Sequence, residues 1–103
     1  MEGTELICFQ IIASVGTARS MYIEAIHEAK EGRFEEARRM IENGEKVFLD
    51  GHHAHLELLK NDVLGNKPEI SILIVHAEDQ LMSAEGFNIL ATEFVDLYEK
   101  ILK

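Results

Sequence analysis

Residues 70–82 read ISILIVHAEDQLM, a stretch in which apolar side chains surround a histidine, two carboxylates and an amide. Its pattern continues to about residue 102 and predicts one long helix. When this helix is sorted by sevens, only one column is consistently polar over the first half. That column comprises Ser71, Glu78, Glu85, Thr92 and Glu99. A helix that is apolar nearly all round is normally buried on several sides, so the stretch predicts an all-α fold in which this helix packs on more than one face.

Two further helices are predicted before it. The first, at about residues 4–31, carries an apolar stripe at spacings of three and four, made of Ile11, Val15, Ala18, Tyr22, Ala25 and Ala29. The second, at about residues 34–64, has the stripe Phe34, Ala37, Ile41, Gly44, Phe48, Gly51, His55 and Leu58. The glycines of this second stripe either permit close packing or mark a kink near Gly51.

The links between the helices are short. Gly32 interrupts the first pattern, and Gly65-Asn66-Lys67-Pro68 is typical of a helix end followed by a turn, so the third helix is expected to begin between Pro68 and Ser71. Short links place neighbouring helices antiparallel. We therefore expect residues 1–103 to form a single domain, an up-down bundle of three helices at about 4–31, 34–64 and 70–102.

Composition narrows the class of partner. The chain has 103 residues and a formal net charge of −9, which argues against a nucleic-acid partner because phosphate neutralisation needs a basic surface. A protein partner with a basic face fits better. The single cysteine, Cys8, cannot form a disulfide framework, and the first ten residues, MEGTELICFQ, lack a secretory signal. No apolar run approaches the ~20 residues of a membrane span, so we expect a cytoplasmic protein without membrane insertion.

One apolar row of the third helix has no place in the bundle core. This row, which we call the outward seam, comprises Ile72, Val75, Asp79, Met82, Gly86 and Ile89. Parallel self-association around it would make a cyclic oligomer. Several copies of Asp79 would then meet near the symmetry axis, where protonation or a divalent cation such as Mg²⁺ or Ca²⁺ would relieve their repulsion. The alternative is that Asp79 lies at the edge of the seam and is solvated.

His76 shares a helix face with Gln80 and Ser83, at i, i+4 and i+7. It also lies within the first two turns of its helix, where the helix dipole favours added negative charge. A phosphorylated imidazole would suit that place, because neutral imidazole is a nucleophile near pH 7. The residues alone nevertheless favour a hydrogen-bonded histidine at a packing surface.

Three other histidines, His52, His53 and His55, lie close together in the sequence, but they form a poor metal site. His52 and His55 point roughly the same way on a helix while His53 points elsewhere, so one helix offers two ligands at most. A packed or solvated role is favoured for them. Residues 25–37 have the Ala…Gly-x-Phe-x-x-Ala pattern of a tetratricopeptide hairpin, but the pattern does not recur as such repeats require.

The segment His76-Ala77-Glu78-Asp79-Gln80-Leu81-Met82 resembles the enzyme IIA component of the lactose/cellobiose family of the sugar phosphotransferase system. That family carries an H-A-x-D-x-L-M signature after an apolar helix start. Further matches in the same register are Ile11-Ile12, Val15-Gly16 with Ala18-Arg19-Ser20, Glu24-Ala25, Ala29-Lys30 with Gly32, Phe34 and Ala37, His52 with Ala54, and Ile70 to Val75. The resemblance spans essentially the whole chain.

The resemblance implies a phosphoryl carrier for uptake of a β-linked disaccharide. His76 would accept a phosphoryl group on Nε2 from the phosphocarrier protein and donate it to a cysteine of the IIB component. Asp79 would meet its two symmetry mates at a divalent cation, such as Mg²⁺, on the axis of a nine-helix homotrimer. Gln80 and Met82 would line or support the site, and His52 matches a histidine of the second helix.

Two departures and two alternatives stand beside this interpretation. His55 occupies a position where the family is expected to have glutamine, and Asn61-Asp62-Val63 replaces a more usual Gln/Lys-Glu-Ala run. The alternatives are a non-enzymatic helical adaptor or protein-interaction bundle, and a metal-binding bundle that uses the cluster around His52.

Overall fold

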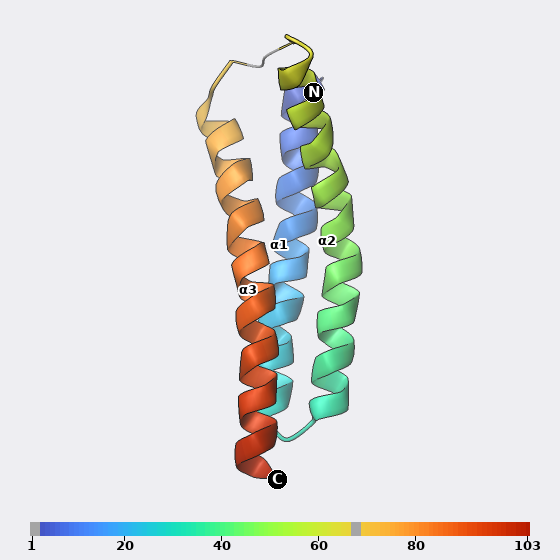
Figure 1. Ribbon diagram of the computed structural model, residues 1–103, viewed down its shortest axis with the longest axis vertical. Coiled ribbons are helices and arrows are strands. Elements are labelled where there is room, and N and C mark those ends of the chain that lie inside the picture. The colour runs from blue at the N-terminus through green and yellow to red at the C-terminus, as the bar shows by residue number, and fades with distance from the viewer. Residues whose placement is uncertain (1–2, 67–68) are drawn as a thin grey trace.

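The computed structural model describes residues 3–66 and 69–103, which form three long helices. Helix α1 spans Gly3–Lys30, α2 spans Phe34–Val63 and α3 spans Ile72–Leu102. In the view of Figure 1 they run down, up and down, and they form a rod measuring 54 × 20 × 17 Å. The predicted all-α, three-helix fold is confirmed. Helix α3 begins two residues after the predicted start at residue 70, and Pro68 lies outside the described residues.

Glycine ends both α1 and α2 in the same way. Gly32 has φ +80° and Gly65 has φ +89°, a left-handed conformation that glycine adopts without a Cβ clash. At each end, the N–H of the glycine and that of the next residue donate back to carbonyls of the last turn, over 2.9 to 3.1 Å. These bonds satisfy carbonyls that would otherwise lack partners, and they turn the chain sharply toward the next helix.

Helix α1 is the central helix and lies against both of the others (Figure 1). Its predicted stripe is completely buried, and Cys8 extends that stripe by one turn toward the N-terminus. The facing row on α3 is dominated by small residues and comprises Ala77, Leu81, Ala84, Ala91 and Val95. Because these side chains are small, the two parallel helices pack closely along most of their length.

Two glycines of α2 allow α1 to approach. A Cβ on Gly44 would lie 2.6 Å from Cε1 of Tyr22, and a Cβ on Gly51 would lie 2.6 Å from Cγ1 of Val15. Both distances are too short for any side chain, and α2 is one continuous helix across Gly51. Of the two expectations for these glycines, close packing is therefore the correct one.

Polar side chains link α2 and α3 at several levels of the rod. Arg38 of α2 donates to Asp96 at 3.0 Å and to Glu99 at 2.8 Å on α3, and further up the rod Asn88 donates to Glu45 at 3.4 Å. Bonds from Lys103 and Arg38 hold the pKa of Glu99 below its usual value. The apolar core thus lies along α1, and the side of α3 that faces away from α1 is left uncovered.

Helix α1 departs from the expectation about membrane spans. By length and composition alone it is apolar enough to cross a membrane. A helix that is central to a folded bundle meets the same criteria, because its buried stripe is apolar. Seven side chains of α1 are fully buried against α2 and α3, so packing within the bundle accounts for part of this apolar character.

We predict that Gly51→Ala destabilises the protein by roughly 1–3 kcal/mol, because the added methyl group overlaps Val15 in a closely packed core. Gly16→Ala is the matched control on α1. A Cβ at Gly16 meets nothing within 4 Å, so the control is expected to gain roughly 0.5–1 kcal/mol from helix propensity. Thermal and denaturant unfolding would measure both. Equal stability of the two variants would contradict the close approach of α2 to α1.

Candidate functional site

His76 lies exposed in the second turn of α3. The helix start is fixed by Ser71, whose Oγ accepts a hydrogen bond from the N–H of Ile74 at 3.3 Å. The cap satisfies one free N–H and leaves the dipole of the first turns directed at the region around His76. The imidazole is therefore accessible to a second protein and lies where added negative charge is favoured.

One side of α3 gathers His76 with three polar neighbours, and we call this surface the His76 flank. Gln80 and Ser83 follow His76 on the same face of the helix and are half-buried. From α1, Nη1 of Arg19 donates to Oγ of Ser83 at 3.2 Å. The flank therefore comprises one exposed nucleophile, an amide, a hydroxyl and a guanidinium, all at the junction of α1 and α3.

The outward seam lies on the opposite side of α3 from α1. Its large side chains are strongly exposed, with Ile72 at 89%, Met82 at 68% and Ile89 at 66%. Asp79 lies among them and is exposed as well. Met82 therefore accompanies Asp79 and does not lie on the His76 flank, whereas Gln80 does.

Glu78 lies on a third side of α3, where it faces α2. Its Oε1 is 2.7 Å from Nε2 of His55, and the histidine side chain is only 14% exposed. This pair is the polar link between α2 and the beginning of α3. The histidine at position 55 thus has a definite structural partner in Glu78.

The other histidines of α2 make aromatic contacts. The ring of His52 stacks on Phe48 with centroids 6.5 Å apart, and the rings of His52 and His53 are 6.1 Å apart and tilted. Among residues 3–66 and 69–103, no three His, Cys, Asp or Glu side chains lie close enough together to hold a metal ion. A single chain offers no metal centre at this cluster in the part of the sequence that the structure describes.

Cys8 is the other nucleophilic side chain near this end of the rod. It is fully buried against the core of α1 and α3. Burial, and secondarily the charge of Glu78, raises the pKa of its thiol. A protonated, inaccessible thiol is not a nucleophile, whereas the imidazole of His76 is exposed.

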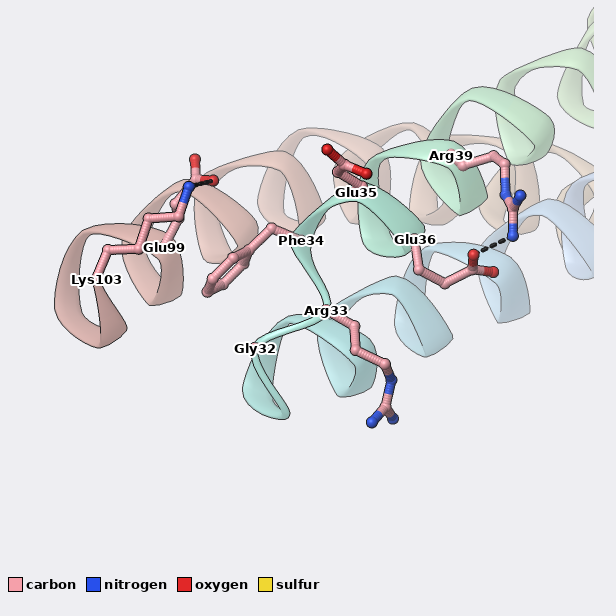
Figure 2. A pocket seen from close by; sticks show the side chains of 8 residues that line it. All are labelled: Gly32, Arg33, Phe34, Glu35, Glu36, Arg39, Glu99 and Lys103. Atoms are coloured by element: carbon pink, nitrogen blue, oxygen red, sulfur yellow. Dashed lines mark hydrogen bonds and ion pairs between the residues drawn. The ribbon is translucent and has the colours of Figure 1, made fainter.

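A hollow of about 710 Å³ lies at the other end of the rod, where α2 begins and α3 ends (Figure 2). Its cationic side chains are engaged by carboxylates: Arg33 with Glu28, Arg39 with Glu36, and Lys103 with Glu99. Lys103 also lies 5.7 Å above the ring of Phe34. With its cationic side chains paired and its surface open, this hollow is a solvated end of the bundle.

Arg19 is the residue of the His76 flank whose role the sequence analysis did not identify. One signal was available, because Arg19 has no acidic residue three or four positions away in the sequence, whereas the other three arginines do. On a helix, such spacing normally supplies the partner of a surface arginine. Its contact with Ser83 joins residues 64 positions apart, and helical periodicity does not report contacts of that kind.

Comparisons with known proteins agree over nearly the whole chain. The family described as "PTS system, Lactose/Cellobiose specific IIA subunit" matches residues 6–99. The lichenan-specific phosphotransferase enzyme IIA component of Bacillus subtilis is 43% identical over 97% of this chain and 91% of the relative. The N,N'-diacetylchitobiose-specific EIIA component of Escherichia coli is 31% identical over 97% of this chain and 86% of the length of that relative.

Solved structures give the same result. The PTS cellobiose-specific enzyme IIA from Bacillus anthracis has a TM-score of 0.93 and 40% identity, covering 98% of this chain and 94% of that one. The IIA(Chitobiose) structure determined in complex with HPr from Escherichia coli has a TM-score of 0.85 and 29% identity, with both chains fully covered. The family match over residues 6–99, with relatives that are 31% and 43% identical over nearly the whole chain, shows that this chain belongs to the lactose/cellobiose-specific IIA family of the sugar phosphotransferase system.

Proposed function

We propose that this IIA component carries its phosphoryl group on His76, accepting it from HPr and passing it to a cysteine of the IIB component. The observation that supports this is that His76 is exposed, whereas Cys8 is buried and Glu78 is paired with His55. One imidazole at the dipole-favoured end of a rigid helix can meet two partners in turn. The route serves uptake of a β-linked oligosaccharide, as the names of the lichenan and chitobiose relatives indicate.

The chemistry needs little from the carrier beyond position. In the first step, the lone pair of His76 Nε2 forms the new P–N bond while the bond to the donor breaks and its electron pair stays with the donor. In the second step, a thiolate of IIB forms a P–S bond and the electron pair of the P–N bond returns to the imidazole. Transfer of this kind depends on alignment and electrostatics. Gln80, half-buried on the same flank, is placed to orient the imidazole or bind a phosphoryl oxygen.

Self-association explains the uncovered outward seam. Ile72, Met82 and Ile89 expose most of their surface in the single chain, which is unusual for a monomer. A Cβ at Gly86 would meet nothing within 4 Å, so this position leaves room for another copy. We propose a parallel homotrimer around the seam, with the three copies of α3 at its centre.

The residues of the seam fit a hard cation. Each chain supplies one exposed carboxylate, Asp79, between the apolar side chains of Val75 and Met82. Carboxylate oxygens are ligands that Mg²⁺ accepts, and a bound cation would neutralise three like charges at an apolar axis. In this proposal the ion supports assembly, and the phosphoryl transfer is performed by His76 away from the axis.

The surroundings of the chain follow from the proposed route. A IIA component meets proteins and does not contact sugar, since the membrane component selects the sugar. The strongly acidic surface, at −9 for the chain, attracts the basic face of a donor such as HPr. We place the protein in the cytoplasm, where the phosphocarrier and the IIB component are found.

We predict that His76→Ala abolishes phosphoryl acceptance, reducing labelling by more than about 100-fold, because the covalent intermediate loses its nucleophile. The measurement is incorporation of labelled phosphate from phosphoenolpyruvate with the general components present. His53→Ala is the matched control, an exposed histidine on α2, and should be labelled like the parent. Circular dichroism should show unchanged helicity for both variants. Normal labelling of the His76 variant would refute the assignment, and absence of labelling in the parent would favour a helical adaptor.

We predict that Asp79→Leu keeps or strengthens the trimer and removes the axial cation, because an apolar side chain relieves the carboxylate repulsion. Light scattering would report the assembly, and equilibrium dialysis should show bound divalent ion falling from about one per trimer to none. Asp50→Leu, at an exposed carboxylate on α2, should change neither property. Dissociation of the Asp79 variant into monomers would contradict the place of this residue at the axis.

A further inference from the structure

We propose that Arg19 orients the docked phosphoryl donor by binding a carboxylate on that partner, next to His76. This inference rests on the proposed function. It assigns to the donor surface one anionic group, placed about two helical turns from the reacting imidazole. The proposal depends on three observations: how Arg19 differs from the other arginines of the chain, where it lies, and the space beside it.

Arg19 differs from the other arginines in its partner. Arg33 pairs with Glu28, Arg38 with Asp96 and Glu99, and Arg39 with Glu36. Within residues 3–66 and 69–103, by contrast, Arg19 bonds only to the neutral hydroxyl of Ser83. The chain has 19 acidic residues, so a half-buried guanidinium without a carboxylate is a marked exception. Such a group retains donors for an external anion.

Its position relates it to the phosphoryl transfer. Ser83 is seven residues after His76 on the same side of α3, a rise of about 10 Å. Side chains of a helix lean toward its N-terminus, and α1 runs parallel to α3 (Figure 1). The side chain of Arg19 therefore leaves α1 in the direction of His76, and its Nη1 reaches Ser83 on the His76 flank. At this distance it does not reach a phosphoryl group on the imidazole, but it lies under a protein docked over it.

The surface next to Arg19 has open space, because the neighbouring residue on that side of α1 is a glycine. Gly16 lies one turn before Arg19 on α1, and a Cβ there would meet nothing within 4 Å. Glycine inside a helix reduces stability. Gly44 and Gly51 are needed for the close approach of α1 and α2, but no neighbouring atom in the described part of the chain requires a glycine at position 16. Without a side chain at position 16, a partner can approach the guanidinium closely from the side of His76.

Charge explains what such a cation does on an acidic protein. A net charge of −9 attracts basic partners in many orientations. One isolated cation beside His76 repels a basic group at that point and favours a carboxylate, which fixes the orientation of the docked donor. The planar fork of the guanidinium matches a carboxylate in two parallel hydrogen bonds. The negative field of the protein attracts basic partners without fixing their orientation, and the single contact with Arg19 makes one orientation of the donor specific.

The test is the steady-state kinetics of phosphoryl transfer from phosphorylated HPr to the complete protein. We expect Arg19→Gln to raise KM for HPr by about tenfold with kcat nearly unchanged, since a lost charge pair weakens binding. Arg19→Lys, which keeps the charge, should restore most of the affinity. Ser83→Ala should have less effect than Arg19→Gln. In all three variants, isolated phospho-His76 should hydrolyse at the parental rate, because Arg19 does not contact the phosphoryl group.

Three results would overturn the proposal. Parental kinetics of Arg19→Gln would show that no partner group uses the guanidinium. A change in kcat or in the hydrolysis rate of phospho-His76 would place Arg19 on the phosphoryl group itself. Dissociation of the oligomer in Arg19→Gln, seen by light scattering, would make Arg19 an inter-subunit contact. The proposed function fails separately, if the parental protein is not phosphorylated at all.

Discussion

The close approach of α1 to both of its neighbours is the constraint on which the rest of the structure depends. Gly44 and Gly51 leave room for Tyr22 and Val15, and a row of alanines does the same on α3. Small facing residues let helices pack at short distance and bury α1 on two sides. The core is consequently confined to α1, and α3 keeps a face that the bundle does not cover.

This arrangement divides the surface of α3 by task. Alanine and leucine face α1, Glu78 and Asp96 face α2, and the outward seam faces away from both. His76 lies on the remaining side, at the edge of the α1 contact. Helical geometry thus separates the side chains of α3 that pack in the bundle from the outward seam and the His76 flank, to which we assign assembly and phosphoryl transfer. The outward seam exposes more contiguous apolar surface than a monomeric soluble bundle usually carries.

Much of this could be predicted from the sequence, because it is periodic. The α1 stripe, the glycine ends and the uncovered row of α3 all repeat at helical spacing or follow from local backbone geometry. Contacts between distant residues could not be predicted. His55 and Glu78 are 23 positions apart, and Arg19 and Ser83 are 64 apart, so no pattern within one helix reveals them. For the same reason, spacing could not decide between close packing and a kink at Gly51. It also underestimated the apolar character of α1. The role of His76 was suggested by the family signature, since periodicity alone favoured an ordinary packed histidine.

The buried position of Cys8 has a consequence for the life of the protein in the cell. Oxidants and alkylating agents react with exposed thiolates, and the one thiol of this chain is completely covered. In the folded bundle this thiol is therefore shielded from oxidants and alkylating agents. The same burial makes Cys8 an intrinsic reporter of opening, since a thiol reagent reaches it only when the upper part of α1 separates from the bundle.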